Sequence, residues 1–181
     1  MYKCQTYKEY IQPIGECGIG FIASEKLFTA AHVIVEMGAA KFRFKSRLYN
    51  PGTHMYHSYN TETNGVNGLD VTIYEGEADS PLKLSALDIE VGAEVECHTW
   101  VRVGNGFEYV IVKGMVHELE GNFFSCIMDD IVLDEGNSGS PLLIEDRVIG
   151  ILHGGRKDTA FCVFQRILPF MLDDITNISY E

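Results

Sequence analysis

The feature that most constrains the fold is a series of short runs rich in Val, Ile and aromatic residues, punctuated by 18 glycines. Short runs of this kind, bounded by turn-forming residues, are typical of β-strands. We predict strands over residues 18–24, 26–29, 41–48, 70–75, 94–103, 107–118, 122–133, 141–144, 147–153 and 160–164. Their spacing favours a barrel or sandwich over alternating strands and helices. The chain is therefore predicted to be all-β.

Two segments differ from this pattern. Residues 49–69 are polar, rich in tyrosine and turn-forming, which predicts an irregular surface loop that lines a cleft. Near the C-terminus, the spacing of apolar residues predicts a short helix over about 166–176, with Pro169 in its first turn.

Composition excludes several classes of function. The net charge of −12 argues against binding to nucleic acid or an anionic membrane, because both require clustered Lys and Arg. No apolar run is long enough to span a membrane, and residues 1–10 lack the apolar centre of a signal peptide. The five cysteines are scattered, which is typical of reduced core thiols in a cytoplasmic protein. They are Cys4, Cys17, Cys97, Cys126 and Cys162.

One loop has the composition of a nucleophilic site. Ser138 lies between two glycines in the stretch Gly136-Asn137-Ser138-Gly139-Ser140-Pro141. Glycines allow backbone N–H groups to converge beside a hydroxyl, as an oxyanion hole requires. Taken alone, the stretch is equally compatible with an ordinary turn between strands.

Two further residues supply what a serine nucleophile needs. His32 follows a predicted strand and two alanines, in Thr29-Ala30-Ala31-His32. Asp70 begins another strand, in Leu69-Asp70-Val71-Thr72-Ile73. Each has an ordinary alternative, a packed core histidine and a loop-capping aspartate. Together with Ser138 they give the order His, Asp, Ser of a catalytic triad.

These three motifs resemble the chymotrypsin/trypsin-like serine proteases over about residues 18–175. The resemblance implies two six-stranded antiparallel β-barrels with a short C-terminal helix. The first barrel would span about 10–85 and the second about 92–165, within one peptidase domain covering 1–181. It also implies that Ser138 attacks the scissile carbonyl, that His32 transfers the proton and that Asp70 orients His32. The backbone N–H groups of Gly136 and Ser138 would form the oxyanion hole.

Departures from the family pattern narrow the resemblance. Digestive and clotting relatives carry an aspartate where this chain has Asn137, and that aspartate pairs with a new N-terminus after zymogen cleavage. Asn137 cannot form this ion pair, so activation by N-terminal insertion is not expected. Val33 replaces the usual cysteine after the histidine, which removes the flanking disulfide. These features are similar to those of the intracellular bacterial and viral branches.

The resemblance also implies a substrate pocket, lined by residues that follow from their position relative to Ser138. These residues are Val132, Leu133, His153, Gly154 and Gly155. The pocket lacks the acidic selector of trypsin-like enzymes, so cleavage after Arg or Lys is disfavoured. A preference for Glu or Gln, read by His153, and a preference for apolar or small residues both remain open.

The expected partner is a protein or polyprotein substrate, and no cofactor or metal is predicted. His54 and His57 have no third ligand at a supporting spacing, and no cysteine pair has zinc-ligand spacing. The alternative to a serine endopeptidase is a catalytically silent binding module with the same fold.

Overall fold

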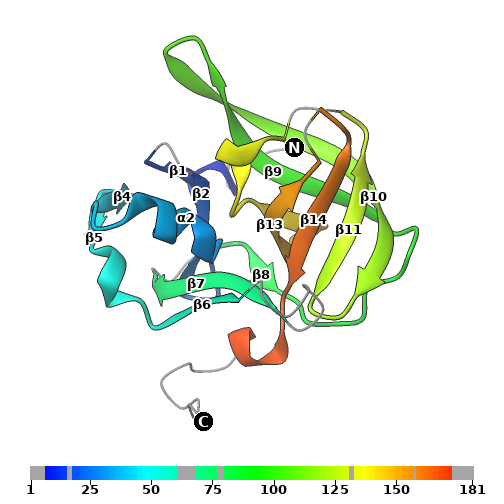
Figure 1. Ribbon diagram of the computed structural model, residues 1–181, viewed down its shortest axis with the longest axis horizontal. Coiled ribbons are helices and arrows are strands. Elements are labelled where there is room, and N and C mark those ends of the chain that lie inside the picture. The colour runs from blue at the N-terminus through cyan, green and yellow to red at the C-terminus, as the bar shows by residue number, and fades with distance from the viewer. Residues whose placement is uncertain are drawn as a thin grey trace.

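The computed structural model describes residues 7–15, 18–60, 68–76, 80–130, 133–156 and 158–172 (Figure 1). The first half contains β1 (Ile11–Ile14), β2 (Gly18–Ala23), β3 (Lys26–Thr29), β4 (Phe42–Phe44), β5 (Arg47–Tyr49), β6 (Tyr56–Asn60) and β7 (Leu69–Glu75). The second half contains β8 (Lys83–Leu84), β9 (Glu94–Val103), β10 (Gly106–Glu120), β11 (Phe123–Met128), β12 (Pro141–Ile144), β13 (Arg147–Gly155) and β14 (Phe161–Arg166). The predicted all-β architecture is confirmed.

In the part of the chain that the structure describes, helical structure is limited to short pieces. The α-helix α2 spans Ala31–Met37, and three 3-10 helices are η1 (Pro51–Thr53), η2 (Glu135–Asn137) and η3 (Pro169–Leu172). Among the described residues, no helix has the length and apolarity needed to cross a bilayer.

The second half closes into a six-stranded barrel. Its strands follow one another in the order β12-β9-β10-β11-β14-β13, and pairing of β12 with β13 completes the ring. Strand β8, at the end of the segment assigned to the first barrel, pairs in parallel with β13. Figure 1 shows the tip of the β9–β10 hairpin projecting beyond the barrel wall.

The first half has a less regular arrangement. Its described strands form a five-stranded antiparallel sheet in the order β1-β2-β3-β7-β6, and β4 and β5 form a separate hairpin. Every residue of β2 and β3 is buried, which explains why their sequences are apolar on both faces. The one charged exception in these two strands is Lys26.

A hydrophobic core joins the two halves. Ile19 and Val71 of the first half pack in one cluster with Leu143, Val148 and Ile151 of the second. Burying a side chain of this size contributes about 1.5–3 kcal/mol, so the relative position of the halves is set by apolar contact. Residues on either half can therefore be held in fixed geometry where the halves meet.

The barrel interior holds three free, buried cysteines, as predicted for reduced core thiols. Burial raises the pKa of Cys126 to about 12 and that of Cys162 to about 11. The pKa of Cys97 is also raised by burial. A thiol that stays protonated is a poor nucleophile, so these three cysteines act as packing residues of the core. Cys4 and Cys17 lie outside the described residues.

Some predicted boundaries were wrong. Segment 49–69 is not wholly irregular, because Tyr56–Asn60 forms β6 and pairs with β7. This strand is half-buried or exposed and has no apolar alternation, so the sequence carries no strand signal there. Residues 41–48 form the β4–β5 hairpin rather than one strand. Helix α2 was not predicted. In the C-terminal helix segment, the described residues form only η3, and residues 173–181 lie outside them.

Candidate active site

His32 is placed by the start of helix α2. The chain leaves β3 at Thr29, and Ala30 at the N-cap position has no side chain that can accept a hydrogen bond. The Asp70 carboxylate fills this role, because its Oδ1 atom accepts from the His32 backbone N–H at 2.8 Å. The residue that orients the imidazole therefore also caps the helix that carries it.

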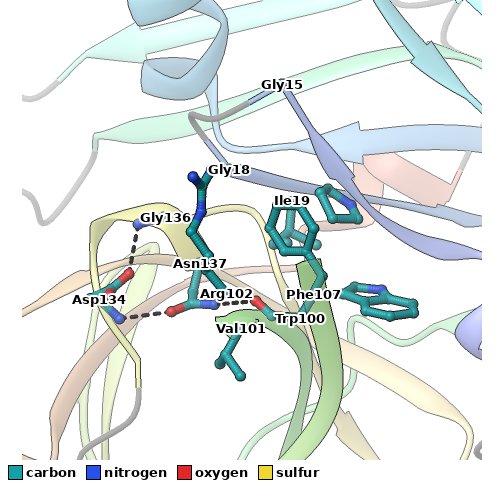
Figure 2. Close-up of a pocket in the computed structure, with 11 residues that line it drawn as sticks. Gly15, Gly18, Ile19, Trp100, Val101, Arg102, Phe107, Asp134, Gly136 and Asn137 are labelled. Atoms are coloured by element: carbon teal, nitrogen blue, oxygen red, sulfur yellow. Dashed lines mark hydrogen bonds between the residues drawn. The ribbon is translucent and has the colours of Figure 1, made fainter. Parts of the chain in front are cut away.

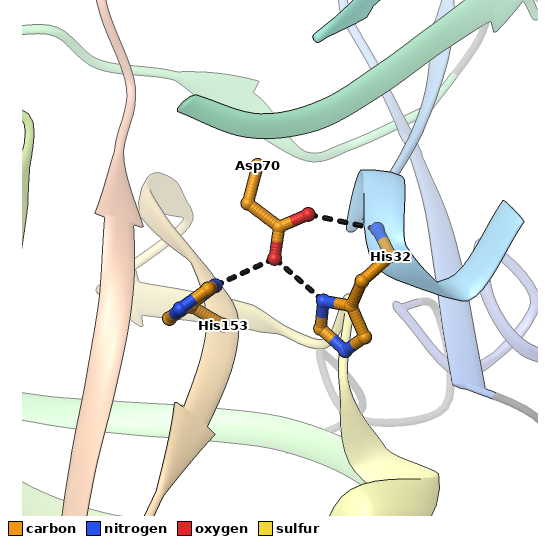
Figure 3. A group of neighbouring side chains, drawn as sticks. All are labelled: His32, Asp70 and His153. Carbon is orange, nitrogen blue, oxygen red and sulfur yellow. Dashed lines mark hydrogen bonds and ion pairs between the residues drawn. The ribbon is translucent and has the colours of Figure 1, made fainter. Parts of the chain in front are cut away.

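Asp70 is completely buried near the start of β7. Its Oδ2 atom accepts hydrogen bonds from His32 Nδ1 and from His153 Nδ1, each at 2.6 Å (Figure 3). An ionised carboxylate can only accept, so both imidazoles carry hydrogen on Nδ1. In His32 this tautomer leaves Nε2 as the basic nitrogen. The predicted pairing of His32 with Asp70 is present.

The two partners alter each other's protonation. Burial opposes ionisation of Asp70, but the hydrogen bonds from His153 and His32 outweigh it and lower the pKa of the carboxyl to about 2. Burial alone would lower the pKa of His32. The hydrogen bond and negative charge of Asp70, helped by Glu36, reverse this and raise it above its ordinary value of 6.5. A raised pKa and a fixed tautomer are the properties that suit an imidazole to general-base chemistry.

The backbone of Asp70 is tied to the second half by Gln165 of β14. The Asp70 N–H donates to Gln165 Oε1 at 2.8 Å, and Gln165 Nε2 donates to the Asn122 carbonyl at 3.0 Å. Gln165 is completely buried, so its amide is held firmly. This contact aligns the half that carries His32 and Asp70 with the half that carries Ser138.

Ser138 follows η2 and is almost completely buried. Its carbonyl accepts from the Ile19 N–H at 2.8 Å, which joins the loop to β2. Gly139 has φ +95°, and a Cβ atom there would overlap the Ile19 carbonyl oxygen. Within the described part of the chain, neither the Ser138 hydroxyl nor His32 Nε2 makes a hydrogen bond. The two groups are therefore not hydrogen-bonded to each other in this structure.

Asn137 holds the serine loop from within. Its Nδ2 donates to the Trp100 carbonyl at 2.8 Å and to Thr99 Oγ1 at 3.0 Å, and its Oδ1 accepts from the Asp134 N–H at 2.8 Å. Ser140 Oγ adds a bond of 2.6 Å to the Asn137 carbonyl. The sequence showed only that Asn137 cannot form the zymogen ion pair, whereas the structure shows it joining the loop to β9.

The predicted oxyanion-hole donor Gly136 has a partner in this structure. Its N–H donates to Asp134 Oδ1 at 2.9 Å, while the Asn137 N–H donates to the Asp134 carbonyl at 3.1 Å. Residues 134–137 thus form a closed turn. The Gly136 N–H must leave Asp134 before it can bind another anion.

A cavity of about 400 Å³ lies beside this turn, between the first half and the β9–β10 hairpin (Figure 2). Its walls include Gly136, Asn137, Trp100, Arg102 and Phe107. None of the predicted pocket residues that the structure describes (Leu133, His153, Gly154 and Gly155) lines this cavity, which lies next to the loop that carries Ser138.

The predicted pocket residues have varied environments. Leu133 is half-buried against the barrel core, and Val132 lies outside the described residues. His153 turns its Nδ1 to Asp70, as described above. Gly154 and Gly155 pair with β14 on one side, whereas the described pairing of β13 with β12 ends at Ile151. Their role in substrate binding remains a prediction.

Tyr59 was not predicted as a site residue, because no motif in the sequence includes it. This residue of β6 is the register partner of Asp70, and its half-exposed ring lies 6.2 Å from the His32 ring. Within segment 49–69, which was predicted to line a cleft, Tyr59 is a side chain that lies beside His32. The cleft itself remains a prediction. Only knowledge of the β6–β7 register could have found Tyr59.

Ligand atoms of His32, Asp70 and His153 lie within 4.8 Å of one another, the only such group of three among the described residues. Both imidazoles already direct Nδ1 to Asp70 at hydrogen-bond distance, so a metal ion would have to displace both bonds. The geometry is that of a hydrogen-bonded group. The absence of a metal remains a prediction.

The fold, with a histidine and a buried aspartate paired where the two halves meet, is that of the chymotrypsin-like proteases. The Rv3671c protease of M. tuberculosis, in its active form, is 19% identical with a TM-score of 0.63, over 90% of this chain and 78% of that one. Kallikrein-related peptidase 10 is 14% identical with a TM-score of 0.66, over 92% and 93%. Tobacco etch virus protease is 14% identical with a TM-score of 0.64, over 97% and 80%.

No protein-family model and no curated protein matches the sequence. At the identities of the matched structures, the likeness is one of fold.

Proposed function

We propose that the protein is a serine endopeptidase that acts through His32, Asp70 and Ser138 on a protein or polyprotein substrate. The observation that carries this proposal is the 2.6 Å hydrogen bond from His32 Nδ1 to the buried Asp70 carboxylate. It fixes the tautomer of the imidazole and raises its pKa, which are the two properties a general base needs. The Ser138 carbonyl accepts from the N–H of Ile19 in β2, so the glycine-framed serine lies on a loop that is bonded to the half carrying His32.

The reaction proceeds by acyl transfer. Ser138 Oγ attacks the scissile carbonyl, and His32 Nε2 takes the hydroxyl proton. Asp70 stabilises the imidazolium that forms. His32 then protonates the leaving amine, which breaks the C–N bond and leaves an acyl group on Ser138. Water, activated in the same way by His32, hydrolyses the acyl-enzyme and restores the serine.

The tetrahedral oxyanion would be bound by the N–H groups of Gly136 and Ser138. One such donor typically contributes about 10²–10³ in turnover. Substrate binding must therefore draw the Gly136 N–H away from Asp134.

An extended substrate has a suitable edge on β13. Beyond Ile151, this strand has no pairing with β12, so residues 153–155 offer backbone groups on that side.

Glu/Gln and apolar preferences both remain candidates at the primary pocket. With Nδ1–H on Asp70, neutral His153 presents only an acceptor at Nε2, which suits a Gln amide. A Glu carboxylate would require protonated His153.

Labelling with a fluorophosphonate tests the serine mechanism. We expect one adduct, located by mass spectrometry at Ser138 and not at the neighbouring Ser140, and lost in His32→Ala. Folded protein that takes no label would overturn the proposal. Hydrolysis of peptide libraries then separates the specificities, since cleavage after Phe or Leu with Glu and Gln peptides ignored excludes the Glu/Gln preference.

A catalytically silent binding module is the second candidate. It is favoured by the bond from the Gly136 N–H to Asp134, which occupies a donor that catalysis would need. This candidate predicts no labelling at Ser138 by a small phosphonate, even at high reagent concentration and with unchanged folding.

A further inference from the structure

The Asp70 carboxylate has two imidazole partners, whereas the proposed triad uses only one. His153 comes from β13, on the opposite half of the molecule from His32, and both rings bond the same oxygen atom (Figure 3). Their ring centroids are 5.8 Å apart and their planes are nearly perpendicular, at 88°. The His153 ring is kept in place by the Phe123 ring, 5.0 Å away.

This arrangement couples the protonation of His32 electrostatically to that of His153. One carboxylate charge serves two groups that can each become positive, and it is completely buried, where charges are poorly screened. A proton on His153 would repel a proton on His32 and would also draw the carboxylate charge toward itself. Even neutral His153 withdraws electron density from Asp70 through its hydrogen bond.

We propose that His153 is a positioning residue that shares the Asp70 carboxylate with His32 and thereby sets the basicity of His32. It holds the carboxylate between the two halves of the molecule. When it gains a proton it makes His32 a weaker base. This inference rests on the proposed function for its catalytic meaning, since His32 is the proposed general base, but its physical content is independent of catalysis.

Other ionisable groups near this cluster are further out. His57 of β6 interacts electrostatically with Asp70, and Glu36 of α2 interacts with His32. Neither hydrogen-bonds the Asp70 carboxylate, and Glu36 has the opposite charge to a protonated imidazole. The facing groups from β11 and β14, Phe123 and Gln165, carry no charge. His153 is therefore the group positioned to compete with His32 for the Asp70 carboxylate.

NMR titration of His32 tests the inference without requiring hydrolysis. The background is Ser138→Ala, which removes the nucleophile, and the six histidines are assigned by single substitution. Three proteins are compared: this background alone, the background with His153→Asn, and the background with His153→Ala. The asparagine keeps a donor near the position of Nδ1 but cannot become charged. His117→Asn is the matched control, because this exposed histidine on β10 does not contact Asp70.

The pKa of His32 is expected to rise in both His153 variants, more in His153→Ala, by roughly 0.5–2 units for charges at this separation. The control should leave it unchanged. A His32 titration that is the same in all four proteins, or that moves to lower pH when His153 is replaced, would overturn the proposal. If His153→Ala does not fold, the Asn variant decides.

A kinetic measurement then links the inference to activity. With Ser138 restored, the acid limb of kcat/KM should move to higher pH in His153→Asn, by the shift seen for His32. A purely structural role would lower stability or kcat without moving this limb. Absence of any labelling at Ser138 with the NMR shift present would contradict only the proposed function. Normal labelling without the shift would contradict only the role of His153.

Discussion

The proposed base and the proposed oxyanion site differ in how far their hydrogen bonds match what catalysis would need. On the side of the base, His32 is locked onto Asp70 by two hydrogen bonds, of 2.8 and 2.6 Å. On the side of the oxyanion, the Gly136 N–H donates to Asp134, and the turn is closed on itself. The proposed base is preorganised, whereas the proposed oxyanion donor Gly136 is bonded to a carboxylate of the same loop.

The difference follows from how each side is built. His32 and Asp70 belong to regular elements, and Gln165 fixes Asp70 across the two halves. The loop that carries Ser138 is short and glycine-rich, and η2 is the only regular structure among its described residues. Buried contacts between elements leave one arrangement, while a loop with an exposed side chain at Asp134 can exchange one hydrogen bond for another. Binding of substrate is therefore expected to change the anion side far more than the base side.

The largest effect should come from removing the charge on the base side. In Asp70→Asn, the amide can still cap α2 but cannot hold His32 with hydrogen on Nδ1 as a carboxylate does. The rate of labelling at Ser138 should fall by about 10⁴, the loss known for this change in a triad. The exposed Asp88→Asn serves as the matched control. A loss below tenfold would contradict the view that the base side is preorganised by this charge.

A smaller loss is expected when the anchor of the anion side is changed. In Asn137→Asp, a carboxylate replaces the amide that donates to the Trp100 carbonyl and to Thr99. Two hydrogen bonds are lost and a charge is buried opposite a carbonyl oxygen, at a cost of about 2–4 kcal/mol. Urea unfolding should show this loss, and labelling should fall by about 10²-fold. Unchanged stability would mean that the loop is ordered by other contacts.

The sequence predicted the base side better than the anion side. His32 follows β3 and Asp70 lies at the start of β7, two strands whose apolar patterns are clear, and the resemblance implied their pairing. The bond between Asp134 and Gly136 depends on a turn of four residues, for which glycine-rich composition permits several conformations. The second partner of Asp70 was also missed, because His153 lies 83 positions from it and was assigned to the substrate pocket. Strand β6 was not predicted because its residues are mostly polar. It pairs with β7 through backbone hydrogen bonds, which leave no pattern in the side chains.

The pH dependence of stability should separate Asp70 from the other carboxylates. Its pKa of about 2 lies below its ordinary 3.8, so the folded state gains roughly 2 kcal/mol that is present above about pH 4 and lost as pH falls through 2. The raised pKa of His32 has the opposite sense, since its contribution is present below 6.5 and lost as pH rises through the folded value. The stability of the wild type relative to Asp70→Asn should therefore be greatest between about pH 4 and 6.5. Urea unfolding at pH 2.5, 5 and 8 measures it, and a pH-independent difference would contradict the assignment.

The smallest effect, and the one that most sharpens the comparison, is expected for Asp134→Ala. Removing the carboxylate releases the Gly136 N–H, while the Asp134 backbone carbonyl still bonds the Asn137 N–H and the Asn137 anchor remains. A hydrogen bond to a charged acceptor contributes about 1.5–3 kcal/mol, part of which solvent offsets at this exposed position. The labelling rate at Ser138 should rise about three- to tenfold, with stability slightly reduced. Asp134→Asn, which keeps an acceptor oxygen without the charge, should fall between the wild type and the alanine variant. A fall in the labelling rate for both variants would show instead that Asp134 supports the active shape of the loop, and that the two sides of Ser138 are equally preorganised.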